Sequence, residues 1–383
     1  MALHFEESEY TARKDKAISA LKAQGLDGLL AFQQETMFYL TGFDTFGFCF
    51  FQCLYLGTDG TLAVLTRSAD LRQAQHTSNI EDIRIWTDEG GAQPATQLRE
   101  MLNDLGVKGK KLGVEYDTVG LTAANGKAVD AALAGFCELE DTSRIVDFIR
   151  VVKSEAELSY VRRAGELADQ SLEAGLAVTR AGADEGDILA AMQGAVFAGG
   201  GDYPGNEFII GSDHDALLCR YKSGRRVLSD NDQLTLEWVG VYRHYHAAMM
   251  RTVVIGELGA RHIKMFDAAQ EAILACENQM RPGKTAGDVF DAHAAVMEKH
   301  GMSAHRLNAC GYSLGATFTP SWMDAPMFYH NNPVVLEPSM VMFAHMILMD
   351  SDSGTAMTLG RSYILGEGAP EKLSKLPLDL LTR

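Results

Sequence analysis

The sequence predicts two consecutive domains, an α/β domain over residues 1–150 and a larger α+β domain over residues 151–383. Three observations support this prediction. Helical and strand patterns alternate through the first 150 residues, a short motif recurs at a fixed interval in the second part, and long apolar strands follow each copy of the motif. A chain of 383 residues is long enough for two such domains.

The first domain begins with an amphipathic helix near residues 8–24 that ends at Gly25. The segments DGLLAF and FFQCLYLG are strands on either side of YLTGF, which we interpret as a loop. TLAVLT is a strand that follows a turn at Asp59 and Gly60, so a hairpin is expected there. KLGVEYD is a further strand, and the domain ends near SRIVDFIRVVKSEAE, where a long helix begins.

The second domain contains an internal repeat. A long amphipathic helix, a glycine turn and a second helix occur twice, and a strand region follows each time, FII at 208–210 and HRLNAC at 305–310. Two ordinary helix-turn-helix connections are the alternative explanation of the motif. The constant interval favours a duplicated half-domain with pseudo-twofold symmetry. Five residues recur 101 positions later in the chain: Arg180, Gly182, Gly186, Asp187 and Ile188 match Arg281, Gly283, Gly287, Asp288 and Val289.

Strongly apolar strands follow each helical pair, at 233–256 and then in VVLEPSMVMFAHMIL and TLGRSYILG. They predict a curved, largely antiparallel sheet backed by four helices. Duplicated halves tend to place a site on their shared axis, where strands from both halves meet. Functional residues are therefore expected in these strands.

Composition and charge narrow the class of partner. The chain has 34 Lys and Arg against 51 Asp and Glu, a formal net charge of −17, which argues against nucleic acid or an anionic membrane as the main partner. The six cysteines form no C-x-x-C pair, and the acidic N-terminus lacks the pattern of a secretory signal. The longest apolar stretch, at 340–349, is too short for a membrane span. We expect a cytoplasmic protein.

Several elements together resemble the family of creatinase, prolidase and aminopeptidase P. In the first domain these are Arg13, GLDGLLAF and YLTGF; in the second they are RVVKSEAEL, the two Arg/Gly/Asp turns, MRTVVIG, GYSLG, LEPSMV and LGRSYIL. The resemblance extends from about residue 10 to the end of the chain. It implies an α/β N-terminal creatinase-like domain followed by a pita-bread catalytic domain with pseudo-twofold halves.

The resemblance also locates five positions at which peptidases of the family bind two metal ions, through two Asp, one His and two Glu. In this chain they are Glu237, Ala248, Tyr312, His345 and Gly360, so only the first keeps a carboxylate. Two divalent cations need several anionic oxygens, and we therefore expect no metal ion and no other cofactor. A single zinc ion held by Glu237, His345 and a nearby histidine stays open as an alternative.

Creatinase acts without a metal, but its pattern has a Glu immediately before the Arg-Thr pair, where this chain has Met250. The chain is more similar to the ectoine hydrolase branch, through Glu237, the run YHAAMMRT, the GYSLG element and a loop with Pro320, Ser321 and Trp322. That resemblance implies metal-independent hydrolysis in which the glutamate bonds covalently to the substrate while a ring amidine is opened.

Glu237 is the first candidate catalytic residue. It lies in the apolar strand LTLEWVGV, where burial should raise the pKa of its carboxyl and suit it to act as nucleophile or acid/base. The alternative is a structural ion pair with Arg243 or Arg251. His244 and His246 share strand parity with Ala248 and are expected to face the same way, and His246 is the candidate base.

His345 and Tyr312 complete the catalytic candidates. His345 lies within the apolar run MVMFAHMILM and is expected to act as a base or as the partner of a substrate carboxylate. Tyr312 can donate a hydrogen bond to developing negative charge. For both residues, as for His246, the alternative is a core side chain with satisfied hydrogen bonds.

Four residues are candidates for substrate binding: Arg220, Arg251, Trp322 and His244. The arginines suit a substrate carboxylate, although Arg251 can equally be structural. Trp322 belongs to a loop able to line an apolar or cationic pocket. Family resemblance implies a homodimer in which FDTFGFCFF at 43–51 reaches the partner's site, although the same segment also reads as a core strand.

The sequence thus predicts a homodimeric, metal-independent hydrolase of a C–N bond, amide or amidine, in a small nitrogenous amino-acid derivative resembling ectoine or creatine. Two alternatives remain open. One is a divergent Xaa-Pro metallopeptidase, and the other is a catalytically retired homologue that binds a ligand.

Overall fold

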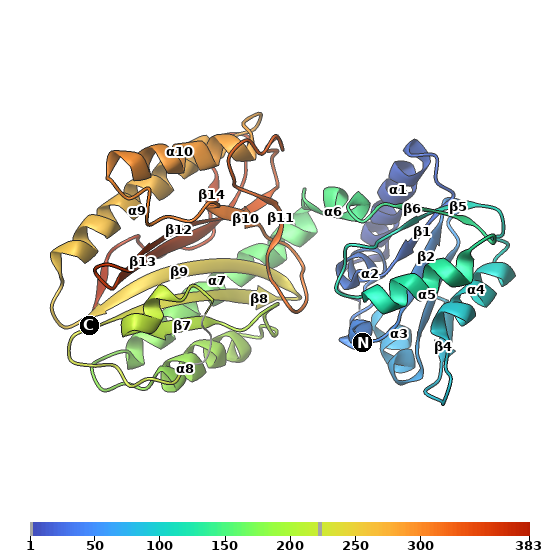
Figure 1. Ribbon diagram of the computed structural model, residues 1–383, viewed down its shortest axis with the longest axis horizontal. Helices are drawn as coiled ribbons and strands as arrows, with labels where there is room; N and C mark the ends of the chain where they lie inside the picture. Colours follow the sequence, from blue (N-terminus) through green and yellow to red (C-terminus); the bar gives the residue numbers. More distant parts are fainter. Residues whose placement is uncertain (1–2, 221–223) are drawn as a thin grey trace. The chain divides into compact units, whose positions relative to one another are not determined.

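The computed structural model describes residues 3–220 and 224–383. The chain divides into two compact units, Met1–Arg150 and Val151–Arg383, and each is built around one β-sheet (Figure 1). This arrangement confirms the predicted fold class of an α/β domain followed by an α+β domain. Within the described ranges, none of the helices combines the length and the hydropathy that a membrane crossing needs.

The N-terminal unit has a mixed sheet in the order β4-β3-β2-β1-β5-β6. Strand β2 pairs antiparallel with β1 and β3, whereas β1–β5, β5–β6 and β3–β4 are parallel. The strands are β1 (Gly28–Ala31), β2 (Cys53–Gly57), β3 (Leu62–Arg67), β4 (Asp82–Trp86), β5 (Lys111–Val114) and β6 (Glu138–Asp141). The α-helices are α1 (Glu7–Ala23), α2 (Gln34–Thr41), α3 (Leu71–Thr77), α4 (Pro94–Asp104), α5 (Ala123–Leu133) and α6 (Ile145–Arg150).

Alternation along the strands places apolar side chains on both faces of this sheet. Leu30 and Tyr55 belong to the cluster that contains α4 and α5 residues, whereas Leu29 and Leu54 belong to the cluster that contains α1 and α2 residues. Helix α1 ends before Gly25, whose φ of 70° is the left-handed conformation that favours glycine after a helix.

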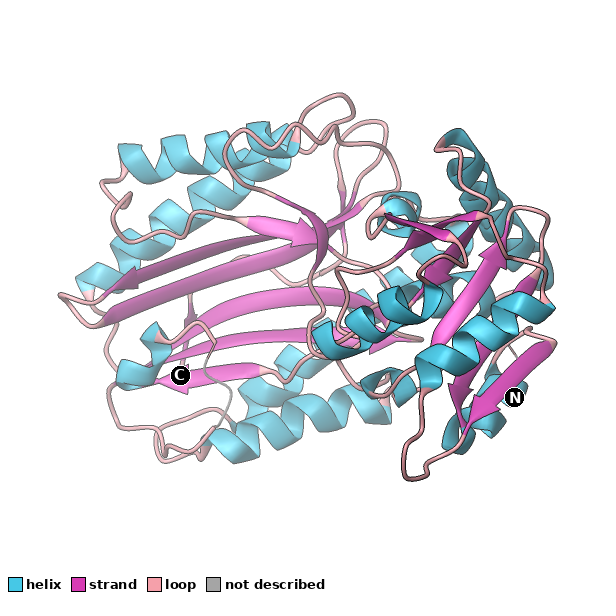
Figure 2. Ribbon diagram, turned by 45° about the vertical axis from the view of Figure 1, so that its right-hand side comes forward, coloured by secondary structure: helices cyan, strands magenta, loops and turns pink. Residues whose placement is uncertain are grey.

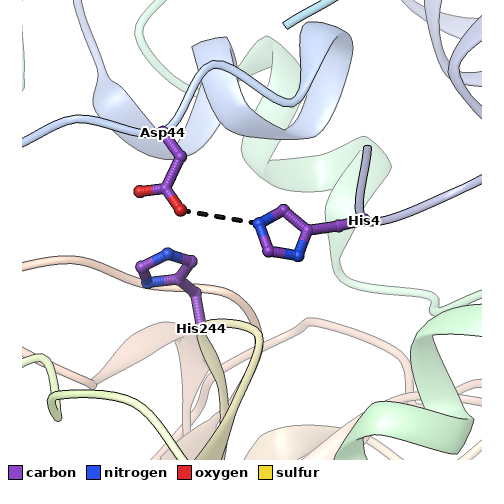
Figure 3. A group of neighbouring side chains, drawn as sticks. All are labelled: His4, Asp44 and His244. Atoms are coloured by element: carbon purple, nitrogen blue, oxygen red, sulfur yellow. Dashed lines mark ion pairs between the residues drawn. The ribbon is translucent and has the colours of Figure 1, made fainter. Parts of the chain in front are cut away.

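One expectation for this unit was wrong. YLTGF is not a loop: Tyr39, Leu40 and Thr41 end helix α2, and Gly42, with φ of 81°, terminates the helix. Of the two readings of residues 43–51, the core strand is not formed, because the segment contains only a short 3-10 turn, Gly47–Cys49. Within this segment Asp44 Oδ2 lies 3.5 Å from Nε2 of His4, as Figure 3 shows.

The C-terminal unit has a larger sheet with the main order β11-β10-β12-β13-β9-β8-β7. Its helices are α7 (Glu155–Val178), α8 (Glu185–Ala198), α9 (Ala260–Gln279) and α10 (Ala286–Lys299). Its strands are β7 (Ile209–Ser212), β8 (Asp232–Tyr242), β9 (Tyr245–Ile255), β10 (Gly311–Ser313), β11 (Asp324–Met327), β12 (Val341–Asp350), β13 (Thr355–Ile364), β14 (Glu371–Lys372) and β15 (Leu381–Thr382).

The predicted duplication is visible in the sheet order. Strands β7, β8 and β9 form one half and β10, β12 and β13 the other, and the halves meet where β9 pairs with β13 (Figure 1). Helices α8 and α10 have the same length and begin 101 residues apart, at Glu185 and Ala286. The strand expected at 305–310 begins instead at Gly311, and within the expected range only Arg306 forms an isolated β-bridge, with Leu348.

Helices cover one face of this sheet. The indole nitrogen of Trp238 donates a hydrogen bond of 2.9 Å to the carbonyl of Ala168 in α7, and Met346 of β12 belongs to the cluster that contains α9 residues. Helix α7 begins with a capping box between Ser154 and Glu157, as the run SEAE suggests. Figure 2 shows the long strands side by side, with the long helices running along them. The residues adjacent to Trp238 and Met346 in their strands therefore point to the opposite face of the sheet, away from the helices.

The apolar stretch at 233–256 is a hairpin of β8 and β9. Its two-residue turn consists of Arg243 and His244, with φ of 51° and 66°. Positive φ at both central positions gives the turn type that matches strand twist, and Asn or Gly usually occupies it. Because neither residue is typical of such turns, the sequence pattern did not reveal it. His244 consequently does not share a strand face with His246.

Candidate active site

Strand register brings two candidate catalytic residues onto one face of the sheet. Glu237 lies opposite Met250, Met250 opposite Gly360, and Gly360 opposite His345, so these positions form one row across β8, β9, β13 and β12. Directly opposed residues of antiparallel strands point to the same face. Trp238, the neighbour of Glu237, points to helix α7. The row therefore lies on the face away from the helices.

Tyr312 joins Glu237 on this face. It lies opposite Phe343, two residues before His345, and its hydroxyl donates a hydrogen bond of 3.1 Å to Oε1 of Glu237. The indole nitrogen of Trp322, in the loop between β10 and β11, donates in turn to the Tyr312 hydroxyl at 2.9 Å. All three side chains are buried, with exposed fractions of 8%, 3% and 1% for Glu237, Tyr312 and Trp322. They form a continuous hydrogen-bonded chain.

Burial and two nearby groups set the pKa of the Glu237 carboxyl. Burial raises its pKa to about 7, while the hydrogen bond from Tyr312 and the positive charge of Arg220 act in the opposite direction. Burial and the negative charge of Glu237 together raise the pKa of Tyr312 well above its ordinary value. At neutral pH, Glu237 is therefore available in both protonation states, and Tyr312 keeps its proton.

His345 is a neutral imidazole with one nitrogen available. Its Nδ1 is buried and has no hydrogen-bond partner within the described part of the chain. The ring centroid lies 5.5 Å from that of Tyr312 and 5.5 Å from that of Phe343. Burial, with a smaller contribution from the charge of Arg220, lowers the pKa of His345 to about 4. The structure thus places a base or hydrogen-bonding group on the same face as Glu237.

Arg220 is the cation of this group. Its positive charge acts to lower the pKa of Glu237, of Tyr312 and of His345. The Arg220 side chain is exposed.

Three predicted site residues do not join this group. His246 lies four residues along β9 from Met250, about 14 Å at the usual strand rise. Its Nε2 accepts a hydrogen bond of 2.9 Å from the backbone of Gly205, and its Nδ1 lies 3.3 Å from the carbonyl of Gly315 and 3.2 Å from the hydroxyl of Thr317. Burial lowers the pKa of His246 to about 4. Both ring nitrogens are engaged, which disfavours the expected role as a base.

His244 and Arg251 do not join Glu237 on its face of the sheet either. His244 lies in the hairpin turn, where its ring stacks on Phe318 at 4.4 Å. Arg251 is opposite Leu236 and points to the helical face, where its guanidinium donates hydrogen bonds of 2.8 Å to the carbonyls of Met250 and Gly360. Strand parity turns Arg251 away from the face that bears Glu237, and the hairpin turn places His244 outside the row of Glu237 and His345. The substrate-binding roles of these two residues stay predictions.

The residues present do not fit a pair of metal ions. Ala248 and Gly360 have no ligand atoms, and a Cβ at Gly360 would lie 2.7 Å from the ring of Phe343, so the aromatic ring fills the space of the fifth ligand. Among residues 3–220 and 224–383, no three ligand atoms of His, Cys, Asp or Glu gather within 4.8 Å around Glu237 or His345. The carboxylate oxygens that two divalent cations require are missing.

Sequence reasoning missed two residues of this region. Phe343 fills the sheet face between Tyr312 and Gly360, and its parity with His345 in the run MVMFAHMILM was a usable signal. Asn206 accepts a hydrogen bond of 3.2 Å from the backbone nitrogen of Trp322. No pattern pointed to Asn206, because it is 116 residues from Trp322 in the chain.

Comparisons with known proteins agree with this architecture. A sequence model of metallopeptidase family M24 matches residues 159–363, and one of the creatinase/prolidase N-terminal domain matches residues 13–152. The chain is 26% identical to an uncharacterised hydrolase/peptidase of Sinorhizobium fredii and 26% identical to ectoine hydrolase of Halomonas elongata, each time over 100% of this chain and 99% of the relative. A solved prolidase of Thermococcus sibiricus has a similar fold, with a TM-score of 0.88 at 18% identity over 98% of this chain and 99% of the prolidase.

Proposed function

Because the chain belongs to metallopeptidase family M24, we propose that it is a hydrolase that cleaves a C–N bond, amide or amidine, in a small nitrogenous amino-acid derivative without a metal ion pair. One observation supports this most directly. At the place where two metal ions would need carboxylates, the chain has a single buried Glu237 whose pKa is raised to about 7 and whose hydrogen-bond partner is Tyr312. The similarity to ectoine hydrolase, which spans the whole chain, points the same way.

The ionised carboxylate of Glu237 has two routes to this reaction. As a general base it accepts a proton from water while the water oxygen bonds to the carbon of the C–N bond; the C–N bond then breaks and that proton passes to the leaving nitrogen. As a nucleophile it bonds to the carbon itself, the C–N bond breaks while the leaving nitrogen takes a proton from solvent, and water then hydrolyses the covalent intermediate and returns a proton to solvent. Either route consumes one water, converts the leaving nitrogen to an amine and restores the carboxylate.

The other side chains have supporting roles in both routes. The hydroxyl of Tyr312 favours the ionised form of Glu237 through its hydrogen bond, and Arg220 adds a positive charge. Arg220 is suited to pair with a carboxylate of the substrate, because a guanidinium binds carboxylates in two-pronged geometry. His345, neutral at pH 7 because its pKa is about 4, offers its unpartnered Nδ1 to a polar group of the substrate.

The proposal predicts the pH dependence of hydrolysis. Since the active form of Glu237 is the carboxylate and its pKa is about 7, kcat/KM should rise with pH along a limb centred near pH 7. At pH 6 the rate constant should be about tenfold below its plateau. A profile that stays flat between pH 5.5 and 8.5 would exclude Glu237 as the group whose ionisation limits the reaction.

The absence of a metal requirement is tested on the purified protein. Ectoine as a cyclic amidine, creatine, and an Xaa-Pro dipeptide are offered as substrates before and after exhaustive dialysis against EDTA, with elemental analysis of each sample. We expect turnover of a non-peptide substrate that survives chelation. Cleavage of the dipeptide that disappears in EDTA and returns with a divalent ion would establish the metallopeptidase alternative, and ligand-induced thermal stabilisation without turnover would indicate a retired homologue.

A further inference from the structure

The hydrogen bond from the Trp322 indole determines where the hydroxyl proton of Tyr312 points. An indole nitrogen is a donor and never an acceptor, so the 2.9 Å contact must be Trp322 Nε1–H donating to the oxygen of Tyr312. The Tyr312 hydroxyl has a single proton, and within residues 3–220 and 224–383 its second hydrogen-bond partner is Oε1 of Glu237 at 3.1 Å, which can accept it. The phenol therefore accepts from Trp322 and donates to Glu237.

We propose that Trp322 is a positioning residue, whose indole N–H directs the Tyr312 proton onto Glu237 and thereby stabilises the carboxylate form of Glu237. The importance of that form for turnover rests on the proposed function, whereas the hydrogen-bonded relay itself does not. Among the described residues, the indole N–H of Trp322 bonds to Tyr312 and not to Glu237, so Trp322 acts through Tyr312.

The loop that holds Trp322 is fixed from a second direction. The backbone N–H of Trp322 donates to Oδ1 of Asn206 at 3.2 Å. Gly205 packs so closely on this loop that a Cβ there would lie 2.8 Å from the carbonyl of Ser321. The backbone of Gly205 in turn donates to Nε2 of His246. The segment around Gly205 therefore contacts the loop that bears Trp322 and is itself hydrogen-bonded to His246.

The same hydrogen bonds assign the tautomer of His246. Nε2 accepts from the backbone N–H of Gly205, so it bears no proton, and Nδ1 donates towards the carbonyl of Gly315 and the hydroxyl of Thr317. His246 therefore links the segment before β7 to the loop after β10. The role of His246 is to hold the loop that carries Trp322, which explains why a histidine far from Glu237 is buried and hydrogen-bonded at both ring nitrogens.

The proposal has a consequence for the acidity of Glu237. A hydrogen bond to the ionised form of a carboxyl lowers its pKa, and here that bond opposes the raising effect of burial. Without the indole N–H, the Tyr312 hydroxyl is free to turn its proton away from Glu237. Trp322→Phe keeps the aromatic ring but removes the donor, so the pKa of Glu237 should rise by about one unit.

The test measures that pKa without any substrate. The full-length protein is labelled with glutamate carrying 13C at the side-chain carboxyl, and the Glu237 signal is assigned as the one missing in Glu237→Gln. Its titration is then followed by NMR in the native protein, in Trp322→Phe and in Asn206→Ala. We expect an upward shift in Trp322→Phe and a smaller upward shift in Asn206→Ala, which loosens the same loop and serves if Trp322→Phe does not fold.

Trp238→Phe is the matched control. Trp238 follows Glu237 in the chain and is buried like Trp322. Its indole N–H, however, donates to the carbonyl of Ala168 on the helical face. This variant also loses one indole hydrogen bond, yet it should leave the Glu237 titration unchanged. A pKa of Glu237 that is the same in the native protein, Trp322→Phe and Asn206→Ala would overturn the proposal, and so would an equal shift in Trp238→Phe. Because the readout needs no turnover, failure of the proposed function leaves this result interpretable.

Discussion

Glu237→Gln should reduce kcat/KM at least about a thousandfold and at the same time make the protein more stable at pH 8. Glutamine has the same shape and still accepts the hydrogen bond from Tyr312, so the fold is preserved. It can neither take a proton nor attack the substrate carbon, so both routes of hydrolysis are closed. Steady-state kinetics on whichever substrate shows turnover provides the first measurement.

The gain in stability follows from the raised pKa of Glu237. A carboxyl with an ordinary pKa near 4.5 when unfolded and about 7 when folded keeps its proton longer in the native state. Its contribution to stability is complete below pH 4.5 and is lost as the pH rises through 7. Glutamine loses nothing over this range, so the variant should gain about 3 kcal/mol in unfolding free energy at pH 8 and nothing at pH 4.

Glu173→Gln is the control for this prediction. Glu173 is exposed on helix α7, so the substitution removes the same charge without altering the sheet face. Urea denaturation of the three proteins at pH 4 and pH 8 separates the two effects. Full activity in Glu237→Gln would refute the catalytic role, and an unchanged stability difference between the two pH values would refute the raised pKa.

Gly240→Ala should cost about 3 kcal/mol of unfolding free energy, the largest loss that we expect from adding one methyl group to this chain. Gly240 lies in β8 where helix α7 crosses the sheet, and a Cβ there would overlap with the carbonyl oxygen of Ala164 and the backbone nitrogen of Ala168. Both obstacles are backbone atoms of a helix, which cannot turn aside as a flexible side chain would. The helix must therefore move away from β8, and the Trp238 to Ala168 hydrogen bond weakens with it.

Gly194→Ala is the matched control for Gly240→Ala. Gly194 is an exposed residue within helix α8, and a Cβ there would meet no atom within 4 Å. Alanine favours the helix by up to about 1 kcal/mol relative to glycine, so this variant should be slightly more stable. The midpoints and slopes of urea denaturation compare the variants. A Gly240→Ala protein as stable as the native one would show that α7 does not pack on β8 as closely as described.

Much of the fold follows from local patterns in the sequence. Gly25 ends the first helix, Asp59 and Gly60 close the first hairpin, and the repeat from Arg180 to Arg281 marks the two halves of the second sheet. These features depend on a few neighbouring residues or on a constant interval, which a single sequence displays. The predicted fold class is confirmed for this reason.

Errors arose where a local pattern had two readings. The turn at Arg243 and His244 lacks the residues usual for positive φ, so one apolar stretch concealed a hairpin. Arg251 belongs to a strand buried on both faces, and burial alone cannot tell which face meets a substrate. The predicted homodimer and the partner role of residues 43–51 stay predictions.

The sequence by itself determined that Glu237 stands alone where the family collects metal ligands, because that conclusion requires only residue identities at five positions. Only the tertiary structure decided what surrounds Glu237. The contacts of Tyr312 with Glu237 and of Asn206 with Trp322 join residues 75 and 116 positions apart. Hydrogen-bond direction and burial arise from such long-range contacts, and no local pattern in the chain encodes them.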